Sequence, residues 1–151
     1  MKLSIFVFFV LLIVATSFDF NTFQFHVGNL KYFIDLPSLL IILIPTILFA
    51  IGSYSRETYV KTWSISFGNP ENCDQSELIE VNKCLNTMGN MSIVMGILGT
   101  LIGLILILQN FHNIGENLGP SLAVAIITLY YGFLLKALFM SASSKVEKYI
   151  K

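Results

Sequence analysis

The sequence predicts an all-α integral membrane protein with four membrane-spanning helices. Of its 151 residues, 55% are hydrophobic and only 12% are charged, whereas soluble domains carry about 25% charged residues. The mean hydropathy is +0.76, and the apolar residues gather in segments long enough to cross a bilayer. The length suits one domain, so we expect residues 1–151 to form a single membrane domain.

Charge and cysteine content exclude several other classes of protein. Nine basic and nine acidic residues give a formal net charge of zero, so no net field attracts a polyanion and we expect no nucleic-acid partner. The two cysteines, Cys73 and Cys84, form no disulfide framework and have no zinc-site spacing. We therefore expect neither a metal nor a cofactor.

Three segments have the length and composition of membrane-spanning helices, which need about 20 mostly apolar residues. They cover residues 36–54, 91–109 and 118–142. Their one charged residue is Lys136, which lies near enough to the end of its segment for its amine to reach the headgroups.

A fourth apolar segment, residues 3–17, has two interpretations. Lys2, the apolar run and the small residues that end it are typical of a cleaved signal peptide. The same segment also suits a short first span whose ends are accommodated by flanking residues. The other three spans are expected in either case.

Basic residues predict the orientation of the chain. If the N-terminus is cytoplasmic, Lys31 is the only one of the nine basic residues outside the cytoplasm, which is a strong positive-inside bias. Both termini are therefore expected to be cytoplasmic. The two cysteines then lie on the reducing side, where thiols stay free.

The segment between the second and third spans, residues 55–90, is too short for a catalytic domain and predicts a cytoplasmic helical hairpin. Gly68-Asn69-Pro70 is a turn signal, and Asp74 followed by Glu77 has the spacing of a capping box. We expect one helix over about 71–110.

Two further expectations concern the chain on either side of the second span. Its helix is expected to continue through Arg56 to Trp63. In the outer loop, phenylalanines alternate at 18, 20, 23 and 25, which indicates either an extended stretch or aromatic anchors at the headgroups. We favour anchors.

Both of the last two spans carry a stripe of small residues with a hydroxyl on it. In the third span the stripe recurs at i, i+3, i+4 and i+7 and consists of Gly96, Gly99, Thr100 and Gly103. In the fourth span it consists of Ser121, Ala125, Thr128 and Gly132, and Pro120 precedes it. Small residues let helices approach closely in lipid, where no hydrophobic effect drives association. Both stripes are expected to pack against a helix or a partner.

The two threonine hydroxyls have two interpretations. They can bond back to carbonyls of their own helices, as is common in membrane helices, or they can line a polar path for ions. No Asp, Glu or His lies in any predicted span, although an intramembrane ionisable group is usual in a proton relay. A carboxylate for ion transport must then come from another chain. The spans offer only hydroxyls, so we do not expect an enzyme.

Two blocks of sequence resemble the MotA/TolQ/ExbB family of ring-forming subunits of ion-driven motors. They are MGILGTLIGLI from Met95 and LGPSLAVAIITLYYG from Leu118. A third block, FIDLPSLLII from Phe33, resembles the start of the second MotA helix, which TolQ and ExbB lack. The likeness is therefore closest to the MotA and PomA stator branch, in a minimal form, and it favours a real first span.

The resemblance implies a homopentamer around a dimer of a single-span subunit of the MotB, ExbD or TolR kind, in a bacterial inner membrane. That partner would bring the missing Asp. Thr100 matches the third-span threonine of the family, but the position of its fourth-span threonine is Leu129 here. We expect Thr128, one residue earlier, to take over the hydroxyl role, which leaves proton or sodium selectivity open.

The short cytoplasmic hairpin makes the usual flagellar load doubtful, because MotA engages its rotor through a large cytoplasmic domain. The function expected is a ring subunit of a channel that couples proton or sodium flow to rotation or force. The alternative is a non-conducting four-helix scaffold or assembly protein.

Overall fold

The computed structural model describes residues 2–19, 23–68, 70, 73–109 and 118–150. The chain forms two compact units, residues 1–36 and 37–151. Each unit is described by itself below.

The first unit consists of helix α1 (Lys2–Ser17), the paired strands β1 (Phe18–Asp19) and β2 (Gln24–Phe25), and the 3₁₀ helix η1 (Val27–Phe33). The strands are antiparallel, with Phe18 opposite Phe25 and their ring centroids 5.2 Å apart. The extended alternative for this aromatic stretch is thus what the described residues adopt, and Phe23 and Phe25 remain exposed.

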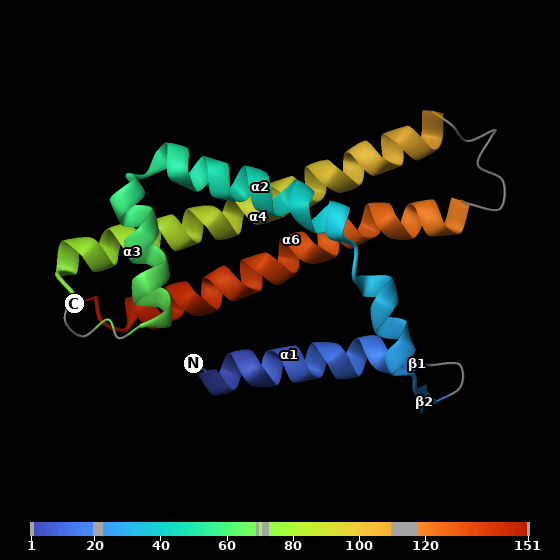
Figure 1. Ribbon diagram of the computed structural model, residues 1–151, viewed down its shortest axis with the longest axis horizontal. Helices are drawn as coiled ribbons and strands as arrows, with labels where there is room; N and C mark the ends of the chain where they lie inside the picture. The colour runs from blue at the N-terminus through green and yellow to red at the C-terminus, as the bar shows by residue number, and fades with distance from the viewer. Residues whose placement is uncertain (1, 20–22, 69, 71–72, 110–117, 151) are drawn as a thin grey trace. The chain divides into compact units, whose positions relative to one another are not determined.

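The second unit is helical, and its elements are α2 (Leu36–Ser53, beginning at the unit boundary), α3 (Arg56–Phe67), α4 (Gln75–Gln109) and α6 (Leu118–Glu147). Figure 1 shows α4 and α6 running side by side, with α3 lying across them at one end. We call that end of the unit the α3 end.

Among the described residues, three helical stretches are long and apolar enough to cross a membrane: Leu30–Ser53, Gln75–Gln109 and Leu118–Glu147. They contain the spans expected at 91–109 and 118–142, and all but the last residue of the span expected at 36–54. The chain is thus an all-α, multi-pass membrane protein. The expected first span over 3–17 is a helix of 16 residues, and its crossing of the membrane stays a prediction.

The expected continuation of the second span through Arg56 to Trp63 is wrong. Helix α2 ends at Ser53, and Ser55 begins a separate helix from an extended conformation (φ −63°, ψ 152°). The Ser55 side chain accepts a hydrogen bond from the backbone N–H of Thr58 at 3.0 Å. Serine favours this N-cap position because it satisfies a backbone donor left free in the first turn.

Helix α4 begins later than expected, at Gln75, and residues 71 and 72 lie outside the described residues. One of the two bonds of the expected capping box is indicated, because a hydrogen bond from the backbone N–H of Asp74 helps to lower the pKa of the Glu77 carboxyl. The helix then continues without a break for 35 residues, or about 52 Å at 1.5 Å per residue.

The core of the second unit lies toward the α3 end. The apolar residues that recur at helical spacing on α4 are almost fully buried: Leu78, Val81, Leu85 and Met88. They pack with Ile42 and Ala50 from α2, Ile65 from α3, and Leu135 and Phe139 from α6. One core therefore joins all four helices, with residues from the predicted second and fourth spans and from the hairpin between the second and third spans.

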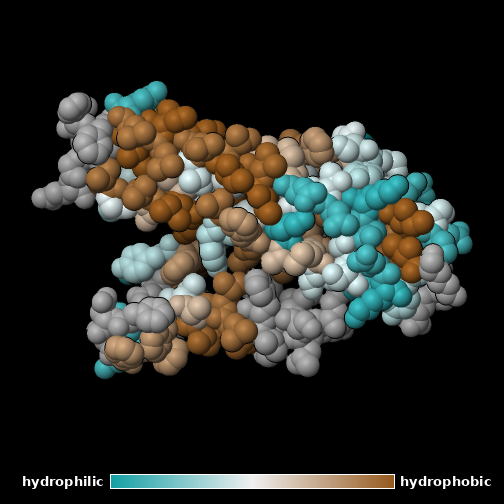
Figure 2. All heavy atoms as spheres, turned by 180° about the vertical axis from the view of Figure 1, so that it is seen from behind, coloured by the Kyte–Doolittle hydropathy of each residue, from teal (hydrophilic) through white to brown (hydrophobic). Residues whose placement is uncertain are grey.

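Polar groups fasten α3 to the two long helices. Lys61 Nζ lies 2.6 Å from the Glu77 carboxylate and 2.9 Å from that of Glu57. From α6, Lys145 Nζ donates to the carbonyls of Ser66 at 2.9 Å and Gly68 at 2.6 Å. A cation at the C-terminus of a helix satisfies free carbonyls and complements the helix dipole. Figure 2 shows the polar surface gathered at this end and an apolar surface over the other end of α4 and α6.

Candidate functional site

The candidate site lies where α4 and α6 come closest, between the small residues of the two stripes. A Cβ atom on Gly96 would lie 3.1 Å from Gly132 Cα, and one on Gly132 would lie 2.8 Å from the carbonyl oxygen of Ser92. Real Cβ atoms almost never make contacts as short as 2.8 Å and seldom as short as 3.1 Å, so the two glycines permit this approach. The two expected stripes therefore face each other within one chain.

The other small residues of the stripes continue this contact. A Cβ on Gly99 would touch Thr128 Cβ at 3.4 Å, and one on Gly103 would meet Ala125 Cβ at 2.8 Å. Ser121, one turn before Ala125, is half-buried, and Pro120 in the first turn of α6 is exposed. We call the contact from Gly96 to Gly103 and from Ala125 to Gly132 the α4–α6 interface.

Thr100 and Thr128 meet inside this interface. Their hydroxyl oxygens are 2.9 Å apart, and Thr100 is half-buried whereas Thr128 is buried. Leu129, at the position of the family threonine, is half-buried, as expected for a residue on the flank of the stripe. The structure thus brings the two expected hydroxyls together.

Both hydroxyls also reach backbone carbonyls. Thr100 Oγ1 lies 2.9 Å from the carbonyl of Gly96, on its own helix, and 2.9 Å from that of Ala125 on α6. Thr128 Oγ1 lies 2.6 Å from the same Ala125 carbonyl. The expected bonding of each threonine to its own helix is therefore observed, together with a bond between the helices.

The geometry permits three complete hydrogen-bond patterns, because each hydroxyl has one hydrogen and two lone pairs. Thr100 can donate to Thr128 while Thr128 donates to the Ala125 carbonyl, or Thr128 can donate to Thr100 while Thr100 donates to the carbonyl of either Gly96 or Ala125. In each pattern hydroxyl oxygens keep lone pairs for a proton donor or a hard cation. The pair thus offers oxygen lone pairs but no carboxylate that could carry a proton.

Polar side chains continue from the threonine pair toward the α3 end. Ser92 donates to the carbonyl of Gly89 at 2.8 Å. Lys136 Nζ donates to Asn90 Oδ1 at 2.7 Å, so the one charged residue of the predicted spans has a polar partner. Further along, Ser143 donates to Asn82 Oδ1. The two links between α4 and α6 were not expected, because sequence spacing on one helix does not reveal its partner on another.

A buried hydroxyl on the second span, that of Thr46, was not among the expected site residues. Thr46 of α2 is 1% exposed, and its Oγ1 has no hydrogen-bond partner among the described residues. Its position directly after Pro45 in an apolar span was the signal available. Within the described part of the chain, no group of His, Cys, Asp and Glu residues could hold a metal ion.

Small residues and hydroxyls at the closest contact of a long apolar helix pair are typical of packed membrane-spanning helices. A sequence profile of the MotA/TolQ/ExbB proton channel family matches residues 71–151, just over half of the chain. The chain therefore belongs to the MotA/TolQ/ExbB family. This match covers α4, α6 and the whole of the α4–α6 interface.

Two relatives share part of this region. Motility protein A of Cereibacter sphaeroides is 43% identical over 56 residues, which cover 36% of this chain and 22% of that protein. An uncharacterized protein of Bacillus subtilis (strain 168), YtxD, is 39% identical over 61 residues, which cover 40% of this chain and 22% of its own length. No solved structure matches the chain.

Proposed function

We propose that this protein is a ring subunit of a proton- or sodium-driven channel that couples ion flow to rotation or force. The observation that carries the proposal is the Thr100–Thr128 pair, whose oxygens lie 2.9 Å apart in the α4–α6 interface. The membership of the chain in a proton channel family supports it, as does the similarity to a motility protein.

A partner subunit forms the second part of the proposal. The predicted spans of this chain contain no Asp, Glu or His, whereas a proton relay through a bilayer normally uses such a group. We propose that a dimer of a single-span protein of the MotB, ExbD or TolR kind supplies an intramembrane Asp. Five copies of this chain would surround it in a bacterial inner membrane, with both termini cytoplasmic.

The branch and the load are further parts of the proposal. The block from Phe33 to Ile42 and the similarity to Motility protein A favour a small member of the stator branch. The polar α3 end is built from only a few turns of helix outside the predicted spans. We propose that it contacts a load other than the usual flagellar rotor, and that no residue of the chain is catalytic.

Native mass spectrometry of the detergent-purified protein tests the assembly. The chain would be purified alone and together with a candidate single-span membrane protein encoded beside it. Five copies of this chain with two of the partner support the proposal. A stable monomer or dimer that binds no such partner contradicts it and favours a non-conducting scaffold, in which both threonines serve only the observed helix packing.

A further inference from the structure

The one charged residue of the predicted spans, Lys136, forms no ion pair within the described part of the chain. It is half-buried, and its amine donates a hydrogen bond to the Asn90 side chain at 2.7 Å. The ion pairs of the described residues instead join Lys61 to Glu57 and Glu77. Withdrawing an ammonium group from water is costly without an opposite charge, and ionisable residues of membrane spans generally pair with one another or mark a functional surface. The Lys136 amine therefore lacks a countercharge.

The Lys136 side chain is held against α4. The Cβ position of Gly89 lies 3.0 Å from Lys136 Cδ and 3.4 Å from its Nζ, so the missing side chain of Gly89 makes room for the lysine. Gly96 lies opposite Gly132. Lys136 is four residues after Gly132 and Asn90 is six residues before Gly96, so the two are offset by only about 3 Å along the helix pair. The amine thus crosses to α4 instead of extending along α6 toward the headgroups.

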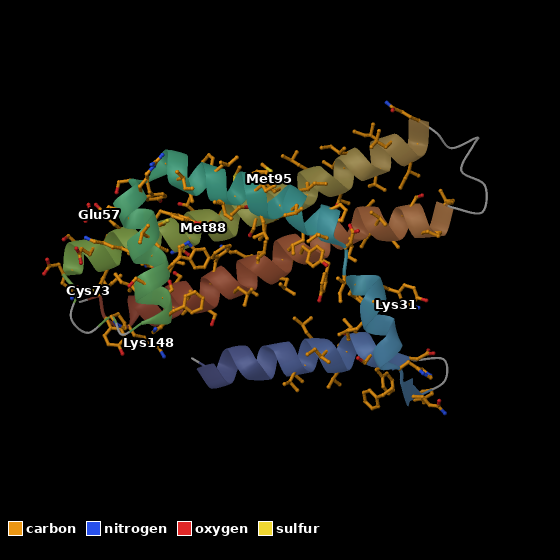
Figure 3. The ribbon with its side chains drawn as sticks, viewed as in Figure 1. Lys31, Glu57, Cys73, Met88, Met95 and Lys148 are labelled. Atoms are coloured by element: carbon orange, nitrogen blue, oxygen red, sulfur yellow. The ribbon has the colours of Figure 1, made fainter. Side chains whose placement is uncertain are left out.

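Asn90 and the amine that it binds lie on the side of the helix pair that α2 leaves uncovered. Helix α2 contacts α4 at Gly99, whose Cβ position is 3.5 Å from Ile41 Cγ2. Met88, labelled in Figure 3, is on the same side of α4 and belongs to the core cluster. At about 100° per residue from Thr100, the α2 side is at about −110° and Asn90 is at about 80°. We call the uncovered side the open face. Large apolar side chains are exposed around the polar pair: Val94, Ile97, Phe133 and Met140.

The open face also gives access to the threonine pair. Between α4 and α6 the glycines leave no space, because a Cβ on Gly96 would lie 3.1 Å from Gly132 Cα, and α2 covers the opposite side. Thr100 is only half-buried, and on α4 it lies between Gly96, at about −40°, and the open face. The carboxylate-bearing span of the proposed function must therefore approach the pair along the open face, where it also meets Lys136.

Lys136 lies closer to the α3 end than the threonine pair does. Asn90 precedes Thr100 by ten residues, and Lys136 follows Thr128 by eight, so the amine is about 12–15 Å from the pair along the helices. A carboxylate at the depth of the pair is too far away to neutralise this amine. A partner helix running alongside α4 and α6 would need a second acidic residue about eight to ten positions from the first.

We propose that Lys136 binds a second acidic side chain of the single-span partner, about eight to ten residues from its intramembrane Asp on the side of the α3 end. This inference rests on the proposed function and adds a contact that fixes the depth of the partner. Lys136 is a positioning residue, because its ammonium pairs with the second carboxylate and so holds the intramembrane Asp level with the threonine pair. The exposed apolar side chains of the open face suit the rest of a membrane-spanning helix.

Carbodiimide cross-linking tests the contact directly, because this reagent joins an amine to a carboxylate only where the two touch. The complex would be purified with the single-span protein encoded beside this chain, treated, digested and analysed by mass spectrometry. We expect a peptide in which Lys136 is coupled to the partner's second acidic residue. Lys83 is the control, because it is exposed on the same side of α4 but nearer the α3 end, and it should not be coupled to that residue. An intact complex without a Lys136 link overturns the inference.

Partner affinity tests the charge. Lys136→Met keeps an unbranched side chain over Gly89 and removes the ammonium. We expect the dissociation constant of the partner to rise about tenfold and to lose much of its dependence on salt, whereas Lys136→Arg and Lys83→Met should bind as the wild type does. Lys136→Glu should bind most weakly, and replacing the cross-linked acidic residue of the partner by lysine should restore its binding. Equal affinity of the wild type and Lys136→Met, or no such restoration, overturns the inference.

Two further results separate this inference from the proposed function and from lipid binding. If the wild-type chain binds no single-span partner, the proposed function fails and this inference fails with it. If the partner binds Lys136→Met unchanged while Thr100→Val and Thr128→Val abolish ion flux, only the role of Lys136 is overturned. A Lys136→Met complex that keeps its partner but loses a co-purifying anionic phospholipid would show that the amine binds a lipid phosphate, which also overturns the inference.

Discussion

The two halves of the α4–α6 pair are held together by different physical means. Near the threonines, the helices meet through glycines and hydroxyls, and the large side chains at that depth point outward, as Leu101, Ile102 and Phe133 do. At the α3 end, large side chains such as Leu85 and Met88 fill the space between the helices. The first arrangement suits lipid, where association depends on close approach, and the second suits water, where burial of apolar area drives packing.

This difference separates stability from function. Large apolar side chains are buried at the α3 end, so this end is expected to contribute most of the stability of the unit. The glycine-lined half contains the polar groups that can handle ions. Substitutions at the α3 end should therefore lower the free energy of unfolding, whereas substitutions in the glycine-lined half should change ion flux.

The largest expected effect on stability comes from Leu85→Ala. Leu85 is 1% exposed, and truncating such a side chain costs about 2–5 kcal/mol through lost burial and a cavity. Chemical unfolding followed by fluorescence of Trp63, the one tryptophan of the chain, measures this cost. Ile79→Ala, at a position 40% exposed on the same helix, is the control and should cost much less. Equal costs would show that the α3 end has no dominant core.

Gly132→Ala tests the other half of the pair. The added Cβ would lie 2.8 Å from the Ser92 carbonyl, and overpacking of this kind costs about 1–3 kcal/mol. We expect the two helices to separate, so that the Thr100–Thr128 hydrogen bond is lost and ion flux falls with it. Gly119→Ala is the matched control, because nothing lies within 4 Å of its Cβ position. A neutral Gly132→Ala would contradict the observed close approach.

Lys145→Gln probes the attachment of α3. Lys145 Nζ donates to the carbonyls of Ser66 and Gly68 at the end of that helix, and charge-assisted bonds at a helix terminus contribute about 1–2 kcal/mol. The variant should loosen α3 and change the emission of Trp63, whose ring centroid is 6.3 Å from that of Phe139. Lys148→Gln, at an exposed residue directly after the end of α6, should leave the emission unchanged. Identical spectra for both variants would exclude the capping role.

Acid gives the smallest expected effect. The pKa of Glu77 is lowered, chiefly because Lys61 donates a hydrogen bond to its carboxylate, and the two carboxylates near Lys61 raise the pKa of that amine. The Glu77 contribution to stability is present above the ordinary carboxyl pKa of about 4.3 and is lost as the pH falls through the lowered value. The Lys61 contribution is present below the ordinary lysine pKa and is lost only at very alkaline pH.

Trp63 emission recorded from pH 6 to 2 tests the acid effect. The wild-type protein should show a small acid transition on α3, because both partners are partly exposed and water screens their charges. Glu77→Gln should remove the transition. A transition of the same size in this variant would assign it to another carboxylate.

The sequence predicted most of the helices because periodicity and composition within one segment are local signals. The spans, the small stripes and the placement of Thr128 rather than Leu129 in the interface all follow from such signals. Ser55 ahead of Glu57 is a signal for a helix N-cap, but the long apolar span before it indicated one continuous helix. As a result, α2 and α3 were expected to be one helix.

What the sequence could not predict are contacts between helices that are far apart along the chain. The links from Lys145 to the end of α3 and from Lys136 to Asn90 depend on the rotation of each helix about its axis. The orphaned hydroxyl of Thr46 could be recognised only once its surroundings were known. The stripes predicted close helix packing, but they did not predict that the stripe of α4 would pack against the stripe of α6.

Ion flux through the assembled complex tests the central claim most directly. The chain and its single-span partner would be reconstituted in liposomes with a pH-sensitive dye inside, and flux would be driven by an imposed membrane potential. We predict that the double variant Thr100→Val, Thr128→Val lowers ion flux about tenfold or more, which corresponds to a barrier higher by at least about 1.4 kcal/mol. The ratio of the two subunits should be unchanged in this variant. The control variant Thr62→Val, which removes a hydroxyl bonded to the Thr58 carbonyl of its own helix, should conduct as the wild type does. Flux equal to that of the wild type in the double variant would show that the hydroxyl pair only packs two helices.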